Sequence, residues 1–128
     1  MDPTDLRYHQ EHEWIRVEGA RATLGISQFA QEALGDIVFL EMPKLNLTVK
    51  AGQEIGEVES TKTTSSIYTP VSGTIVKVNA DLQDHPETVN ADPYGKGWMV
   101  VIDLADPAQV DTLMTAAQYD AFLNSQKK

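Results

Sequence analysis

The sequence predicts a mainly β fold, a compact barrel or sandwich built from short strands. Short apolar or alternating segments recur along the chain, and Gly and Pro residues separate them at intervals typical of an all-β domain. This spacing does not fit βαβ units, in which a helical segment joins successive strands. At 128 residues the chain is long enough to bury a core, and one domain over residues 1–128 is the default expectation.

The expected strands differ in how they bury their side chains. Residues 14–18 alternate, with Ile15 and Val17 on one face, as in a half-buried strand. Residues 36–41 form an apolar run bounded by acids and too short for a buried helix, so we expect a strand buried on both faces. The other expected strands cover residues 21–26, 54–59, 67–71, 74–78 and 98–104.

Capping signals predict short helices between and beside these strands. Ser27 is a suitable N-cap for a helix over residues 28–34, and Gly35 can end that helix in a left-handed conformation. Asn79 is expected to cap a single helical turn near residues 81–83. The chain therefore has helical elements on the flanks of the strands and not as crossovers between them.

The C-terminal third begins with a loop and ends in a helix. Residues 84–97 are rich in Gly and Pro and are expected to form a loop. Asp106, followed directly by proline, has the pattern of an N-cap and first helical position. Thr115 followed by Gln118 forms a capping box, which predicts a C-terminal helix over residues 116–124.

Composition excludes several classes of function. The net charge of −9, from ten Lys and Arg against nineteen Asp and Glu, repels nucleic acid and anionic membranes. Cysteine is absent, which excludes disulfides, thiolate metal sites and a cysteine nucleophile. Residues 1–5 are acidic and lack the apolar region of a signal peptide. We therefore expect a bacterial cytoplasmic protein, with a mature mitochondrial matrix protein as the alternative.

One lysine stands apart from the others. Lys62 lies in a run of Ser and Thr, residues 60–66, that offers nothing to anchor in a core, and β-like segments flank the run on both sides. An amine at the tip of a rigid hairpin is accessible and has a fixed direction, as a modifying enzyme requires. The residues therefore suggest a modified lysine that carries a swinging cofactor. The alternative is a solvated loop lysine with no special role.

A second cluster suggests an enzyme. His9 and His12, with the carboxylates of Glu11 and Glu13, resemble a set of metal ligands. The two histidines would share a face only in a helix, whereas the residues that follow have the alternation of a strand. We therefore expect no metal site, and we expect His12 to pack beside Trp14 or to lie at the surface.

Three segments occur in the order and spacing of one known family. They are His12-Glu13-Trp14, then Glu59-Ser60-Thr61-Lys62 with Pro70-Val71-Ser72-Gly73, then Asp92-Pro93-Tyr94-Gly95-Lys96-Gly97-Trp98. Gly35-Asp36-Ile37-Val38-Phe39 and the pair Val89-Asn90 fit the same pattern. Over nearly its whole length, from Tyr8 to about Phe122, the chain resembles the glycine cleavage H-protein family.

The resemblance implies a barrel-sandwich hybrid of the lipoyl/biotinyl type, with lipoate in amide linkage to Lys62. It implies a carrier that catalyses no bond change itself. In the family, a pyridoxal-phosphate glycine decarboxylase (P protein) loads an aminomethyl group onto the lipoyl sulfur. An aminomethyltransferase (T protein) passes the one-carbon unit to tetrahydrofolate, and a dihydrolipoyl dehydrogenase (L protein) reoxidises the arm. A lipoyl-attaching enzyme is a further expected partner, and a monomer is the expected state.

The resemblance also implies a cleft that shelters the loaded arm from water. Glu13 occupies the matching acidic position, so we name it as the cleft candidate, where it could pair with the aminomethyl ammonium. The alternative is a carboxylate on the surface of a strand. The family usually has a second acid four places after the lysine, where this chain has Ser66. This departure leaves the docking of the loaded arm less well defined.

The tip sequence differs from those of two other kinds of carrier. Lipoyl domains of 2-oxoacid dehydrogenases usually show Asp-Lys-Ala at the tip, and biotinyl domains usually show Met-Lys-Met, whereas this chain has Thr61-Lys62-Thr63. An H-like protein that donates lipoyl groups to other enzymes stays open as an alternative, because sequence does not reveal partner enzymes.

Overall fold

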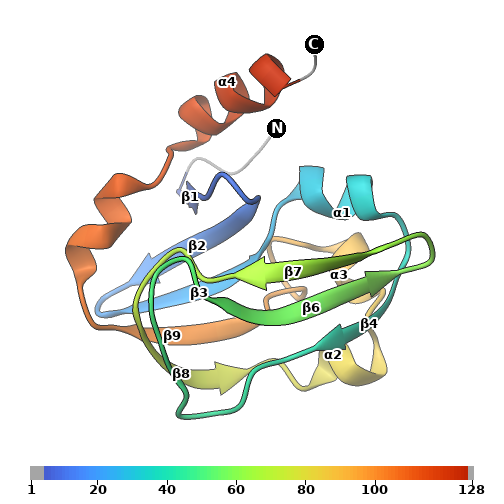
Figure 1. Ribbon diagram of the computed structural model, residues 1–128, viewed down its shortest axis with the longest axis horizontal. Coiled ribbons are helices and arrows are strands. Elements are labelled where there is room, and N and C mark those ends of the chain that lie inside the picture. The colour runs from blue at the N-terminus through green and yellow to red at the C-terminus, as the bar shows by residue number, and fades with distance from the viewer. Residues whose placement is uncertain (1–4, 127–128) are drawn as a thin grey trace.

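Two antiparallel sheets face each other in the computed structural model, which describes residues 5–126 (Figure 1). The first sheet has the order β1 (Arg7–Tyr8), β2 (Glu13–Glu18), β3 (Arg21–Ile26), β9 (Val100–Leu104), β8 (Gly73–Val78) and β5 (Thr48–Val49). The second has the order β4 (Ile37–Glu41), β6 (Glu54–Ser60) and β7 (Thr64–Tyr68). The expected mainly β class with short flanking helices is confirmed, and the two sheets do not close into a barrel.

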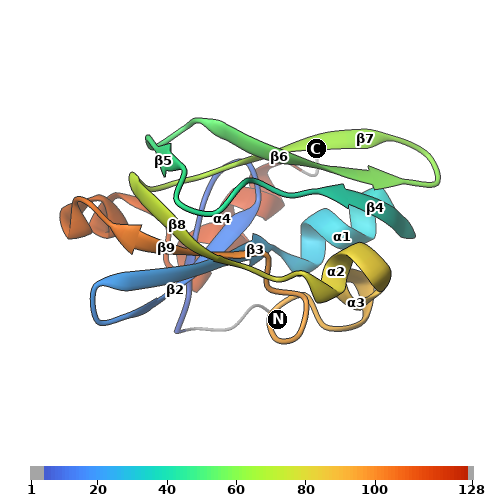
Figure 2. The ribbon, with the colours of Figure 1, turned by 90° about the horizontal axis from the view of Figure 1, so that it is seen from below.

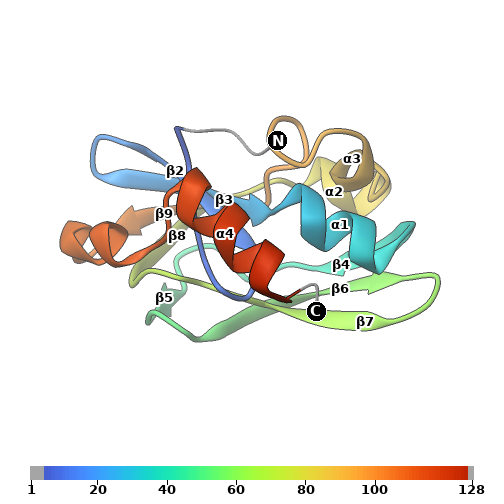
Figure 3. The same ribbon diagram turned by 90° about the horizontal axis from the view of Figure 1, so that it is seen from above.

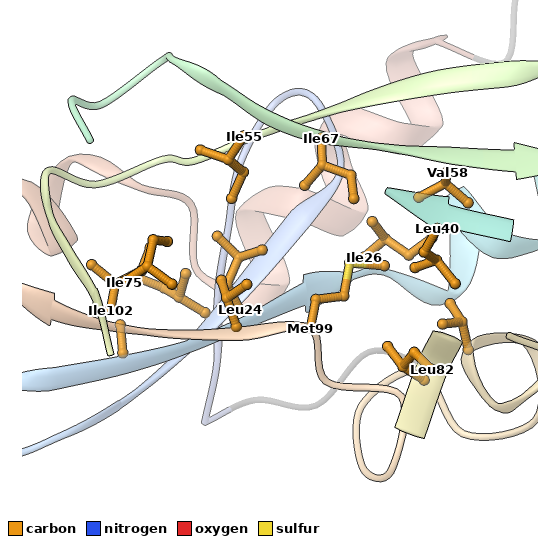
Figure 4. Packing of buried hydrophobic residues seen from close by; sticks show 14 of the residues in the cluster. Leu24, Ile26, Leu40, Ile55, Val58, Ile67, Ile75, Leu82, Met99 and Ile102 are labelled. Atoms are coloured by element: carbon orange, nitrogen blue, oxygen red, sulfur yellow. The ribbon is translucent and has the colours of Figure 1, made fainter. Parts of the chain in front are cut away.

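The main core fills the space between the two sheets. Figure 2 shows β6 and β7 in one layer and β2 and β3 in the other. Apolar side chains from both layers meet there (Figure 4), among them Leu24, Ile26, Leu40, Ile55, Val58, Ile67, Ile75, Met99 and Ile102. Leu82 closes the core at one end. Burial of these apolar side chains between the sheets is the main driving force for the fold.

Three of the helices begin where the predicted capping residues place them. Helix α1 (Gln28–Leu34) has Ser27 as its N-cap, whose hydroxyl accepts from the Ala30 N–H at 3.2 Å. The 3₁₀ helix η1 (Pro107–Thr112) starts after Asp106, and α4 (Ala116–Gln126) follows the predicted capping box. Figure 3 shows α1 and α4 on the same side of the molecule. Between residues 5 and 126, no helix combines the length and apolar character needed to cross a bilayer.

The strand expected over residues 36–41 is not buried on both faces. Val38 and Phe39 of β4 are each 48% exposed. β4 is the edge strand of the three-stranded sheet, and its pairing with β6 shifts between Ile37 and Phe39. Such a bulge inserts an extra residue, so neighbouring side chains lose strict alternation and both can face solvent. An uninterrupted apolar run therefore did not indicate a buried central strand.

Two further expectations about the middle of the chain were wrong in part. The Asn79 side chain does not cap α2 (Asp81–Asp84); its Nδ2 donates to the Lys96 carbonyl at 3.0 Å and the Trp98 carbonyl at 2.7 Å. The expected loop over residues 84–97 contains a further helical turn, α3 (Thr88–Ala91). The Asn79 amide stabilises the protein more by pairing two buried carbonyls than it would by capping a solvated helix end, because buried carbonyls left without a hydrogen bond are costly.

Trp14 organises a second, aromatic cluster outside the main core. It is fully buried, and its Nε1 donates to the carbonyls of Ile26 and Pro93, each at 3.0 Å. The contact with Pro93 explains why the segment around residues 92–98 packs here. Gly25 lies directly opposite Trp14 in the β2–β3 pairing.

Gly25→Ala is expected to lower the free energy of unfolding by about 1–3 kcal/mol or more through overpacking. A Cβ on Gly25 would lie 2.7 Å from Cζ2 of the buried Trp14 ring, which cannot retreat without moving the cluster. Urea unfolding would measure the change. In a Trp14→Phe background, the same substitution should cost less, because the smaller ring leaves room. Equal costs in the two backgrounds would contradict the proposed clash.

Candidate functional site

Lys62 lies at the tip of the β6–β7 hairpin, in a turn of three residues. β7 starts at Thr64 and ends at Tyr68, so the strand expected over residues 67–71 is placed too late. Its pairing with β6 sets this start, since Thr64 lies opposite Glu59 in the antiparallel ladder. Half of the polar run is therefore strand, and the tip is shorter than the composition suggested. Lys62 itself is exposed.

The Ser60 hydroxyl organises the turn from inside. Its Oγ accepts from the Lys62 N–H at 3.3 Å and from the Thr63 N–H at 3.1 Å, and it donates to the Thr63 carbonyl at 3.0 Å. The Ser60 N–H also donates to the Thr63 carbonyl at 2.8 Å. Ser60 is 7% exposed, so water competes little for these bonds. The backbone on both sides of the exposed Lys62 is thus held.

Glu13 lies at the other end of the hairpin and is buried. It is 1% exposed, so the alternative of a surface carboxylate is wrong. Its Oε1 lies 2.9 Å from His9 Nδ1, and its Oε2 accepts from the Tyr68 N–H at 3.0 Å. Burial raises the pKa of the Glu13 carboxyl above its ordinary value, although these hydrogen bonds act in the opposite direction. Because Tyr68 belongs to β7, this carboxyl also joins the two sheets.

The Glu13 carboxyl and the amine are separated by the length of β7. Strand geometry places the two ends of β7, Thr64 and Tyr68, about 14 Å apart, and Lys62 lies two residues before Thr64. Ser66 lies between them and is half-buried. Its hydroxyl carries no charge, so the site has one buried acid and not two. Contact between Glu13 and a group attached to Lys62 therefore requires a long arm.

A cavity of about 460 Å³ opens beside the base of the hairpin. It is bounded by the N-terminal segment, the turn before β6 and the C-terminal helix, with His9, Gln10, Gly52, Pro70, Met114 and Phe122 among its lining residues. Since His9 also contacts Glu13, the buried carboxyl lies one side chain away from this cavity.

The histidines do not converge on one site. His9 is engaged by Glu13, whereas His12 Nδ1 lies 2.8 Å from the Tyr119 hydroxyl. The His12 ring is half-buried and packs against Phe29 and Phe122, and burial lowers its pKa. Within residues 5–126, no group of three or more His, Cys, Asp or Glu side chains is arranged to hold a metal ion.

Several residues that hold the surroundings of the site together by hydrogen bonds were not predicted as site residues from the sequence. The Tyr119 hydroxyl also bonds to Ser27 Oγ at 2.7 Å, so α4 is tied to the start of α1. The Thr61 N–H donates to the Asp36 carbonyl at 3.0 Å, which ties the hairpin tip to the end of α1. Asn90, recognised only as part of the family pattern, bonds to the same turn. No local pattern signals these contacts, because they join segments far apart in the sequence.

A lysine exposed on an organised hairpin turn, in a domain of two facing sheets, fits the class of carrier proteins of the lipoyl-domain type. The chain belongs to the glycine cleavage H-protein family: the family model "Glycine cleavage H-protein" matches residues 6–126. It is 53% identical to the glycine cleavage system H protein of Myxococcus xanthus, over 96% of this chain and 95% of that one. Identity to the Bacillus subtilis H protein is 52%, over 92% and 93%.

The structural comparison agrees with the sequence comparison. The crystal structure of a glycine cleavage system H protein from Mycobacterium marinum superposes with a TM-score of 0.87 and 42% identity, covering 95% of this chain and 98% of that one. The chain is therefore a carrier component of the glycine cleavage system.

Proposed function

We propose that residues 1–128 form one lipoyl-carrier domain and that Lys62 bears the lipoyl group. The loaded chain shuttles the aminomethyl group of glycine from the P protein to the T protein and passes electrons to the L protein. The observation that carries the proposal is the exposed Lys62 amine on a turn whose backbone is held by Ser60 and Asp36. A monomer in the cytoplasm, with no nucleic-acid or membrane partner, belongs to the same proposal and agrees with the net charge of −9.

The attachment step needs an accessible amine and an activated acid. The unprotonated Nζ of Lys62 attacks the carbonyl of an activated lipoyl donor, such as an acyl adenylate. The amide bond forms, AMP leaves with the electron pair of the broken anhydride bond, and the amine loses a proton. Exposure of Lys62 permits this approach, and the bonds from Ser60 keep the turn from rearranging. The product is neutral, so the tip loses one positive charge.

When bound, the group supplies a disulfide and dithiol pair that accepts a one-carbon unit and two electrons. This chain tethers the group at an exposed tip, fixes the direction of the tether and supplies the cleft that shelters the loaded end. A short flexible tether keeps a reactive end at an effective concentration on the order of millimolar near its own protein surface. The hairpin confines that freedom to the arm, because Ser60 and the β6–β7 ladder fix the backbone.

We propose Glu13 as the acidic residue of the sheltering cleft. Its carboxyl is buried beside β7, the strand that runs from the tip to the base of the hairpin. An ammonium brought to this region would meet a carboxylate from which water is largely excluded, where a charge pair is stronger than in bulk water. Ser66, midway along β7, adds no second charge to this path.

Glycine-dependent release of carbon dioxide tests the proposed function. We expect the lipoylated protein to support release by a purified P protein at saturating glycine. The matched control is the unlipoylated protein from the same expression, which should show only background release. A lipoylated protein that fails with an active P protein, yet passes its lipoyl group to an acceptor domain, would favour the alternative H-like relay.

A further inference from the structure

Asn90 makes three hydrogen bonds where α1 is joined to β4: one to Gln31 in α1, one to Gly35 in the turn and one to Ile37 at the start of β4. Its Nδ2 donates to the Gly35 carbonyl at 2.8 Å and to Gln31 Oε1 at 2.9 Å. Its Oδ1 accepts from the Ile37 N–H at 2.9 Å. A carboxamide is suited to this place, because the turn presents a carbonyl and an N–H together. Asn90 comes from α3, so these contacts hold two segments that are far apart in the sequence.

The same turn holds the tip of the hairpin. The Asp36 carbonyl accepts from the Thr61 N–H at 3.0 Å, directly before the candidate lysine. In Figures 1, 2 and 3, α1, α3 and the start of β4 lie at the same end of the molecule as the β6–β7 turn. Movement of the α1–β4 turn would therefore be passed to the residue that precedes Lys62.

Gly35 gives this turn a second contact with the lysine. Its φ of 80° and ψ of −154° lie in a region that is essentially restricted to glycine. A Cβ on Gly35 would lie 3.5 Å from Lys62 Cε, so the aliphatic part of the lysine passes across the open face of the glycine. The carbonyl of Gly35 is the one to which Asn90 donates.

We propose that Asn90 is a positioning residue for Lys62. It fixes the α1–β4 turn, and that turn fixes the direction in which the amine leaves the hairpin, through Thr61 and Gly35. The proposal rests on the proposed function, in which a partner enzyme must meet the amine in line with an activated carbonyl. Since a misplacement of about 1 Å can cost on the order of a hundredfold in rate, a loosened turn should slow the modification without removing the lysine.

Three variants separate positioning from stability. Asn90→Ala removes all three bonds, whereas the isosteric Asn90→Asp keeps an acceptor for Ile37 and sets an oxygen against the Gly35 carbonyl. The matched control is Val89→Ala, a truncation of a fully buried neighbour in the same helix that has no bond to the turn. Melting temperatures are measured for each, and assays are run where all variants are equally folded.

The readouts are amide dynamics at the tip and the kinetics of modification. In the unmodified protein, we expect both Asn90 variants to lower the ¹H–¹⁵N NOE of Thr61 and Lys62 and to speed their amide exchange. With a lipoate ligase and ATP, kcat for modification should fall about tenfold or more while KM changes little, because the surface of the protein is retained. Val89→Ala should leave both readouts at the wild-type level.

Two results would overturn the proposal. One is wild-type NOE values and kcat in both Asn90 variants. The other is an equal loss in Val89→Ala, which would make Asn90 a stabilising residue and nothing more. If the wild-type protein is never modified, the proposed function fails instead, and the NOE comparison still decides whether Asn90 orders the tip.

Discussion

Lys62→Arg should abolish lipoylation completely and leave the fold intact. Arginine keeps the positive charge, but its guanidinium stays protonated, so it cannot act as the nucleophile that forms an amide. The side chain is exposed, and its backbone is held by bonds that do not involve the amine. The change in unfolding free energy should therefore stay within about 0.5 kcal/mol. Intact-mass measurement after expression in a lipoate-competent host reads out the modification directly.

Lys50→Arg is the matched control for this experiment. Lys50 is also exposed and lies in a turn directly before β6, so it tests whether any accessible turn lysine is modified. One lipoyl group should be present in the wild-type protein and in Lys50→Arg, and absent in Lys62→Arg. A wild-type protein that stays unmodified when a lipoylating enzyme is supplied would refute the attachment site. Modification that persists in Lys62→Arg would move the site elsewhere.

The parts of the fold that were predictable from sequence are those set by local physics. Alternation over residues 14–18 located β2, although Trp14 and Ile15 are buried on opposite faces and Val17 is 40% exposed, so burial is not confined to one face. The hydroxyl of Ser27 and the capping box at Thr115 located the starts of α1 and α4, since a helix leaves its first N–H groups unpaired. In each case the residues that determine the structure lie within a few positions of one another.

The expectations that failed depend on contacts between distant segments. The start of β7 is set by its register with β6, and the exposure of both Val38 and Phe39 follows from the shift in the pairing of β4 with β6. The Asn79 side chain donates to two carbonyls in the segment near Trp98 instead of capping a helix. Neither sheet order nor a distant carbonyl can be inferred from the residues on either side.

The candidate site shows the same division. Lys62 stood out because the polarity of its own segment marked it as exposed. The residues that fix its turn could not be recognised from the sequence. Asp36 accepts a hydrogen bond through its backbone carbonyl, which any residue type supplies, and Asn90 bonds to Gly35, which is far away in the sequence. Glu13 was placed by the family pattern, but its burial and its bond to Tyr68 required the arrangement of both sheets.

Glu13→Ala should lower the free energy of unfolding by about 1–3 kcal/mol, because it leaves the Tyr68 N–H and His9 without their buried partner. Glu13→Gln keeps an acceptor for Tyr68 and should cost less. Burial raises the pKa of Glu13 above its ordinary 4.5, so its stabilising contribution is present below that value and is lost as the pH rises through the raised pKa. The stability of the wild type relative to Glu13→Gln should therefore decline as the pH rises above 4.5, which urea titrations at a series of pH values would measure.

Glu13→Ala and Glu13→Gln together show whether the charge of Glu13 or its packing protects the loaded arm from hydrolysis. Both should accept lipoate at Lys62 normally, because Glu13 lies at the far end of β7 from the amine. Both should shorten the lifetime of the aminomethyl-loaded carrier, measured by ammonia release after removal of the P protein, if the carboxylate pairs with the ammonium. A normal lifetime in Glu13→Gln with a short one in Glu13→Ala would assign the shelter to packing. Unchanged lifetimes in both variants would leave Glu13 as a link between the two sheets and remove it from the cleft.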